Sequence, residues 1–118
     1  MGSGTLRPPQ QGVLFDVLSF IDENLTSDLS VPALAARAQI STRQLARAFL
    51  IETKLAPRAY VEQRRVNAAA RMLEREPIAL NQIALRCGFA AARTLARAFK
   101  RSFGISPGRY RAGARLPR

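Results

Sequence analysis

The pentapeptide LARAF occupies residues 45–49 and occurs again, unchanged, at residues 95–99. The repeat extends beyond five residues, because a proline and a tyrosine follow each copy at the same distances: Pro57 and Tyr60, then Pro107 and Tyr110. Upstream, the match continues after a slip of one residue and pairs Leu34 and Ala35 with Ile83 and Ala84. Two units are too few for a solenoid, which needs about three stacked repeats. The sequence therefore predicts one module built twice within a single domain.

The two faces of a LARAF helix differ in polarity. Residues three and four positions apart share a helix face, so the leucine, the second alanine and the phenylalanine form an apolar stripe. In the two copies these residues are Leu45, Ala48 and Phe49, and Leu95, Ala98 and Phe99. We expect this stripe to be buried, and we expect Arg47 and Arg97 on the opposite face to be exposed.

Helix start signals come before the first copy. Ser30 precedes a Val-Pro pair, which is the pattern of an N-cap with proline in the first turn. Ser41 and Gln44 have the spacing of a capping box and predict a helix over 42–53. A short helix, a brief turn and a second helix form a helix-turn-helix. This unit is predicted over 30–54.

A longer helix and a second unit follow. The longer helix is predicted over 57–75, because Pro77 prevents it from continuing. The second helix-turn-helix is predicted over 80–104, with Gly104 placed to end its last helix at a positive φ. We therefore expect an all-α fold of about seven helices, with two helix-turn-helix subdomains joined by a connecting helix.

The remaining segments set the domain limits. Residues 1–12 are interpreted as a cloning scar followed by a linker, because they contain a Gly-Ser-Gly run and a pair of prolines. An acidic amphipathic helix is expected to begin at Val13. The domain is therefore placed at 13–112, and 113–118 is interpreted as a basic tail.

Basic residues are concentrated in one part of the chain. The sequence has 19 basic and 8 acidic residues, a net charge of +11. Residues 1–40 carry a net charge of −2, whereas the rest carries +13, and no acidic residue follows Glu76. Seventeen of the basic residues are arginine, whose planar guanidinium suits phosphates and guanine edges. A polyanion is the expected partner.

The residue types also limit the chemistry. The chain has no histidine, and its single cysteine, Cys87, falls at an inward helical position. We therefore expect no catalytic residue, no metal site and no cofactor. No apolar run approaches the ~18 residues of a membrane span, and no signal peptide is evident. The expected location is the cytoplasm, with no membrane partner.

A linked set of motifs in the second unit resembles a known family. The motifs are Ile83-Ala84-x-x-x-Gly88-Phe89, Thr94-Leu95-x-Arg97-x-Phe99-Lys100 and Phe103-Gly104-x-x-Pro107-x-x-Tyr110-Arg111. They resemble the C-terminal DNA-binding domain of the AraC/XylS family of bacterial transcription regulators, over about residues 13–112. The stretches 34–38 and 85–89 look closest to regulators whose N-terminal half resembles the DJ-1 and amidotransferase-like fold. The resemblance places effector binding in such a half, upstream of this sequence.

The resemblance implies sequence-specific binding of double-stranded DNA by a monomeric domain. Its two recognition helices would enter successive major-groove faces of a bipartite site, about 34 Å apart. Base-reading positions of the family fall on Arg43, Ala46, Arg47, Ala92, Arg93, Thr94 and Arg97. Phosphate contacts would fall to Ser41, Thr42, Arg58, Lys100, Arg101 and Arg109. RNA polymerase is a further candidate partner.

Three departures from the family pattern affect these expectations. Ala90, Ala91 and Ala92 stand where relatives often have serine, so the second recognition helix lacks an N-cap hydroxyl. Lys54 replaces a common glycine, which predicts strain or a different helix end. Ala46 cannot form a hydrogen bond with a base, so recognition there would depend on apolar contact or DNA shape.

Two other classes of protein are the alternatives. A non-specific nucleic-acid-binding protein would explain the charge, but it would not explain two spaced helix-turn-helix units. It would also need aromatic side chains for base stacking, and aromatics are only 7% of the chain. An enzyme would have to use Cys87, which is placed for packing.

Overall fold

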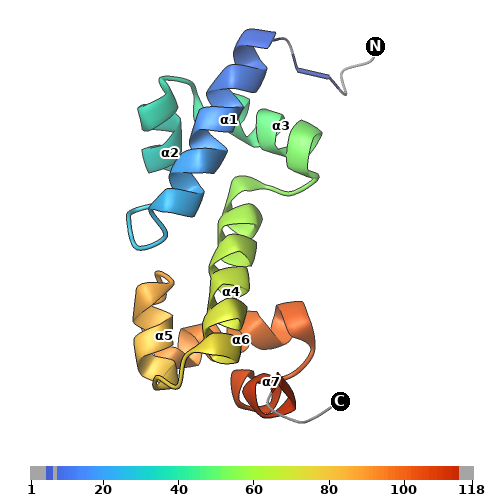
Figure 1. Cartoon of the computed structure of the whole chain (residues 1–118). Helices are drawn as coiled ribbons and strands as arrows, with labels where there is room; N and C mark the ends of the chain where they lie inside the picture. The colour runs from blue at the N-terminus through green and yellow to red at the C-terminus, as the bar shows by residue number, and fades with distance from the viewer. Residues whose placement is uncertain (1–4, 7, 115–118) are drawn as a thin grey trace. The chain divides into compact units, whose positions relative to one another are not determined.

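The computed structural model describes residues 5, 6 and 8–114, which form seven α-helices and no strand (Figure 1). The helices are α1 (Pro8–Glu23), α2 (Val31–Ala38), α3 (Thr42–Thr53), α4 (Pro57–Arg75), α5 (Leu80–Arg86), α6 (Ala92–Phe103) and α7 (Pro107–Ala114). The chain divides into two compact units, a first unit up to Val61 and a second unit from Glu62 onward. The boundary falls inside α4. The all-α class expected from the sequence is confirmed.

The N-terminal segment differs from the expected linker. Helix α1 begins at Pro8, five residues before the predicted start at Val13, so residues 8–12 are helical. Proline is favoured in the first turn of a helix, because the amide hydrogens there have no partner within the helix. Leu6 is buried in the core of the first unit, and its carbonyl oxygen accepts a hydrogen bond from the Gln11 side chain. The proposed scar at 1–4 lies outside the described residues.

The C-terminal end also differs from the expectation of a tail from residue 113. Helix α7 extends to Ala114, so the first two residues of that segment are helical. Residues 115–118 lie outside the part of the chain that the structure describes.

The core of the first unit lies among α1, α2 and α3. α1 packs on both other helices, and α2 packs on α3. Its buried residues are Leu6, Leu14, Val17, Ile21, Leu29, Leu34, Ala35, Leu45, Phe49 and Val61. Phe49 is fully buried and meets the Tyr60 ring edge-on, with centroids 5.5 Å apart and an angle of 71°.

Sequence signals account for the helix ends in the first unit. The Ser30 side chain accepts a hydrogen bond from the Ala33 amide at the start of α2. Ser41 and Gln44 form the predicted capping box at the start of α3, with bonds of 3.0 and 2.9 Å. α3 covers the expected range 42–53.

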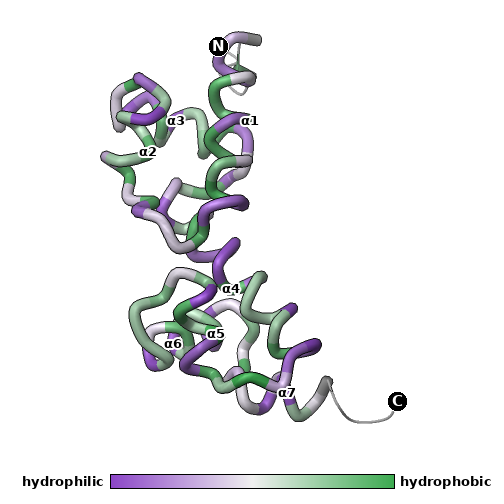
Figure 2. The backbone as a smooth tube through the Cα atoms, turned by 60° about the vertical axis from the view of Figure 1, so that its left-hand side comes forward, coloured by the Kyte–Doolittle hydropathy of each residue, from purple (hydrophilic) through white to green (hydrophobic). Residues whose placement is uncertain are grey.

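The second unit contains the rest of α4 together with α5, α6 and α7. α5 packs on α6, and α6 packs on α7. Its buried residues are Val66, Ala68, Ala69, Ala70, Leu73, Ile83, Ala84, Cys87, Phe89, Leu95, Ala98 and Phe99. Three rings meet in this core, because Phe99 stacks on Phe103 and the Tyr110 ring lies edge-on to both. Both units alternate hydrophobic and hydrophilic segments along their helices (Figure 2).

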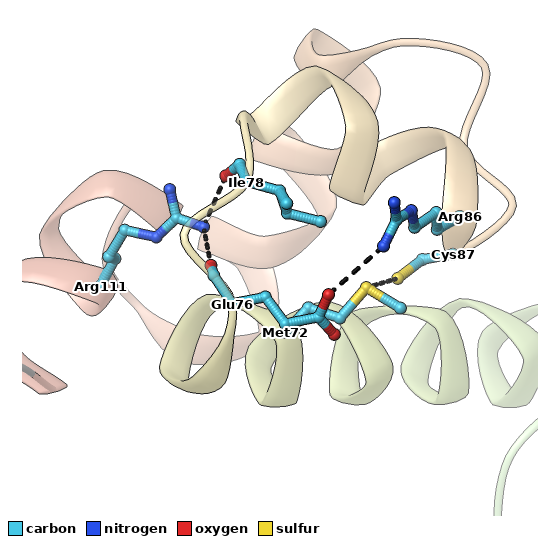
Figure 3. Close-up of polar contacts among 6 residues, drawn as sticks. All are labelled: Met72, Glu76, Ile78, Arg86, Cys87 and Arg111. Atoms are coloured by element: carbon cyan, nitrogen blue, oxygen red, sulfur yellow. Dashed lines mark hydrogen bonds and ion pairs between the residues drawn. The ribbon is translucent and has the colours of Figure 1, made fainter.

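Arg111 fastens the end of α4 to α7. Its guanidinium group donates hydrogen bonds to three backbone carbonyl oxygens, those of Leu73, Glu76 and Ile78, at 3.5, 3.0 and 2.8 Å. Figure 3 shows two of these bonds converging on one nitrogen of Arg111. The last carbonyl oxygens of a helix have no partner within it, so Arg111 satisfies groups that would otherwise need water.

Candidate nucleic-acid interface

The outward face of α3 carries two arginines above a buried stripe. Leu45 and Phe49 are buried, whereas Arg43 and Arg47 are exposed one helical turn apart. Ala46, between them, is half-buried. Arginines four residues apart on an isolated helix repel each other, so this face favours an anionic partner.

The outward face of α6 is more strongly basic. Arg93, Arg97, Lys100 and Arg101 are all exposed, and we call these four residues the α6 cation face. Its opposite side is buried through Leu95, Ala98 and Phe99. The four cations, with Ala96 and Ser106, line an open groove of about 510 Å³ in the second unit. Thr94 is exposed and Ala92 is half-buried at the first turn of the helix.

The starts of the two helices differ, as the sequence predicted. Ser41 caps α3, whereas Ala91, the N-cap residue of α6, makes no side-chain capping bond. Ser41 therefore already uses its hydroxyl oxygen within the protein. Amide hydrogens at the first turn of a helix attract anions, because they add to the positive end of the helix dipole.

The ends of the two helices differ as well. Lys54 ends α3 at φ 65° and Gly104 ends α6 at φ 79°. Both lie in the left-handed region, where a residue with a side chain is strained. The lysine that replaces glycine therefore adopts the conformation that glycine would adopt without strain.

The remaining residues expected to contact phosphates lie on several elements. Thr42 is exposed at the start of α3, and Arg58 is exposed at the start of α4. Arg109 is exposed on α7, where its amide donates a hydrogen bond to the Ser106 hydroxyl oxygen. Within the first unit the structure gathers Arg43, Ala46 and Arg47 on one helix face.

Besides Ser41, a second residue expected to contact phosphate, Arg101, already has a partner within the protein. The Arg101 guanidinium donates a hydrogen bond to Glu62 at 2.9 Å and forms an ion pair with it. Both side chains are substantially exposed, at 62% and 42%. Glu62 is not among the expected site residues, and the spacing of 39 residues gives no local signal for this pair.

Arg111 is the second residue whose contacts the sequence did not reveal. It belongs to the C-terminal motif, yet the expected site residues did not include it. Its three acceptors are backbone carbonyl groups, which no residue type in the sequence could indicate.

Cys87 has the surroundings of a packing residue. It is fully buried, and burial raises the pKa of its thiol, which keeps the thiolate scarce. Its sulfur lies 3.9 Å from the Met72 sulfur (Figure 3). Among the described residues, none of the helices has the length and hydropathy that a membrane span requires.

Known helix-turn-helix proteins match most of this chain. A family model described as a helix-turn-helix domain matches residues 34–113. The chain is 47% identical to the HTH-type transcriptional regulator Rv1931c of Mycobacterium tuberculosis, over 66% of this chain and 30% of that protein. It is 32% identical to the multiple antibiotic resistance protein MarA of Escherichia coli, over 83% of this chain and 77% of MarA.

A solved structure shares the fold. The DNA-binding domain of AdpA, a global transcriptional factor crystallised in complex with a target DNA, superposes with a TM-score of 0.83 and 37% identity. The match covers 86% of this chain and 92% of that one. The chain spans 30 to 39% of the length of the first curated relatives that it matches.

Two helix-turn-helix units with exposed arginines on their second helices define a DNA-binding domain of the helix-turn-helix class. The family match covers well over half of the chain. The chain belongs to the AraC-type helix-turn-helix family of transcription regulators. The family expected from the sequence is thereby confirmed.

Proposed function

We propose that this chain binds double-stranded DNA by placing α3 and α6 in successive major-groove faces of a bipartite site. One observation carries the proposal. Helices α3 and α6 bury the same leucine and phenylalanine and expose arginine at matching positions, Arg43 with Arg93 and Arg47 with Arg97. A major groove about 12 Å wide accepts an α-helix, and arginine forms paired hydrogen bonds with guanine.

The proposal gives the exposed residues two roles. Base edges would be contacted by Arg43, Ala46, Arg47, Ala92, Arg93, Thr94 and Arg97. Phosphates would be contacted by Ser41, Thr42, Arg58, Lys100, Arg101 and Arg109. At Ala46 and Ala92 the side chain offers only a methyl group, so these positions would select by contact with a thymine methyl or by DNA shape.

The assembly is part of the same proposal. One chain would occupy both halves of its site, because each unit supplies its own recognition helix. The isolated chain would bind DNA as a monomer in the cytoplasm. At the promoter it would contact RNA polymerase. Catalysis has no place in this function, and the buried Cys87 would serve packing alone.

Selection of binding sites from a randomised duplex library tests the proposal directly. We expect a bipartite sequence with its halves about 10 base pairs apart. The double variant Arg93→Ala, Arg97→Ala should lose preference in one half only. Arg75→Ala, which removes an exposed arginine outside the proposed contacts, is the matched control and should return the wild-type site. Selection with no sequence preference at physiological salt would contradict the proposal and favour a non-specific binder.

A further inference from the structure

The α6 cation face includes an ion pair with α4. Arg101 donates to the Glu62 carboxylate at 2.9 Å. The next residues of the same two helices also meet, because Gln63 donates to the Ser102 hydroxyl oxygen at 3.1 Å. Two consecutive contacts therefore hold the last turn of α6 against α4, within the second unit.

The Glu62 carboxylate stands beside an otherwise basic surface. α6 contains no acidic residue, and Arg101 lines the same groove as Arg93, Arg97 and Lys100. Glu62 reaches this surface from α4. A carboxylate and a DNA phosphate are equivalent acceptors for a guanidinium group, since both accept its hydrogen bonds through anionic oxygens.

We propose that Glu62 acts as an internal competitor for DNA phosphate at Arg101. The proposal rests on the proposed function, because it concerns the same α6 surface. A duplex that contacts Arg101 must displace the Glu62 carboxylate, which then faces the phosphates without its partner. Glu62 therefore lowers the part of the affinity that depends on phosphate contacts and is independent of sequence.

The exposure of the two side chains limits the strength of this competition. Both side chains are open to water, so the ion pair changes an equilibrium constant by no more than about fivefold. The released Glu62 would also attract a cation from solution. Binding would then release fewer counterions overall, and its salt dependence would be shallower than the number of phosphate contacts predicts.

The test uses the Glu62→Gln variant of the whole chain, with affinity measured on the selected site and on a random duplex across a salt series. We expect binding to tighten about two- to fivefold on both duplexes at low salt. The slope of log affinity against log salt should steepen by up to about 0.9. In an Arg101→Ala background the same substitution should tighten binding no more than a general change of net charge does, because no arginine remains at that position.

Glu76→Gln is the matched control. Glu76 pairs with Arg86 at 3.3 Å, with exposures of 43% and 52%, and neither residue belongs to the α6 cation face (Figure 3). The control removes the same charge and also frees an arginine, so it measures the general effect of net charge. We expect its tightening to be clearly smaller than that of Glu62→Gln.

Three results would overturn the inference. Equal tightening in Glu62→Gln and Glu76→Gln would assign the effect to net charge. Tightening of the same size in the Arg101→Ala background would separate it from the ion pair. Weaker binding by Glu62→Gln would mean that Glu62 orients α6. A wild-type chain without sequence preference would instead contradict the proposed function, and the random duplex would still test the competition at Arg101.

Discussion

The two units repeat the same core with different helix ends. In each, a buried phenylalanine meets a tyrosine eleven residues later at an angle of 71°, Phe49 with Tyr60 and Phe99 with Tyr110. The second unit adds Phe103 to this contact, where the first has Thr53, whose hydroxyl donates to the Phe49 carbonyl oxygen. Identical residues therefore preserve the packing, and the differences lie at its edges.

The helix ends show opposite choices. In the first unit α2 and α3 have the side-chain caps Ser30 and Ser41, but both helices end at left-handed residues that are not glycine, Gln39 and Lys54. In the second unit α5 and α6 lack such caps but are followed by Gly88 and Gly104 at the corresponding left-handed positions. Each of these two helix pairs is thus stabilised at the ends where the other is not.

The outer faces of α3 and α6 differ in charge. α3 carries Arg43 and Arg47 against Glu52, a net of +1, whereas α6 carries four cations and no acid, a net of +4. Leu50 is exposed on α3 at the position of Lys100 on α6. We infer that, in the proposed complex with DNA, binding by α6 depends more on attraction to phosphates and binding by α3 depends more on direct contacts.

Truncation of the two repeated phenylalanines should have the largest effect. Phe99→Ala should destabilise its unit by about 3–5 kcal/mol, and Phe49→Ala should lie at the lower end of this range. Phe99 loses two ring contacts and Phe49 loses one, and such pairs contribute about 0.5–1.5 kcal/mol each. Urea unfolding followed by NMR signals of each unit measures both losses. Equal losses would contradict the role of the third ring, and Phe15→Ala, at an exposed position, is the control.

Removal of the matching arginines should have the next largest effect. Arg47→Ala and Arg97→Ala should each weaken binding to the selected site by about 1–3 kcal/mol and relax preference at one base pair. The affected base pairs should lie in different halves, because the arginines belong to different units. Competition binding with singly substituted sites measures this. Equal losses on selected and random DNA would show that neither arginine contacts a base.

Exchange of the N-cap residues should change stability by about 1 kcal/mol. Ser41→Ala should destabilise the first unit by this amount, because the Gln44 amide loses its acceptor. Ala91→Ser should stabilise the second unit by up to about 1 kcal/mol. Hydrogen exchange at the first turns of α3 and α6 reports each change. The absence of a gain for Ala91→Ser would mean that the backbone there does not allow a cap.

Exchange of the C-terminal residues should have the smallest effect. Lys54→Gly should stabilise the first unit and Gly104→Ala should destabilise the second, each by about 0.5–1 kcal/mol. The left-handed conformation costs about 1–2 kcal/mol, and the greater freedom of glycine in the unfolded chain offsets part of this. A methyl group at Gly104 would have no atom within 4 Å, so its effect is purely conformational. Thermal unfolding measures both variants, and changes of the same sign would contradict the explanation.

Local patterns predicted most of this fold, since the repeat, the capping box and the left-handed glycine each depend on neighbouring residues. The sequence missed the start of α1, because a pair of prolines is typical of both a linker and a first helical turn. It also missed the Glu62–Arg101 pair and the acceptors of Arg111, which join residues more than thirty positions apart. The outward arginines followed from helical periodicity, whereas their contacts with DNA stay predictions.

The bonds of Arg111 have a consequence for synthesis of the protein. The carbonyl oxygens that it satisfies, at the end of α4 and just after it, precede it by 33 to 38 residues. The N-terminal part of a chain emerges from the ribosome first, so the first unit can fold while the second is still being made. The carbonyl oxygens there receive these hydrogen bonds only after α7 has been made. A chain that ended just before Arg111 would leave them exposed to water.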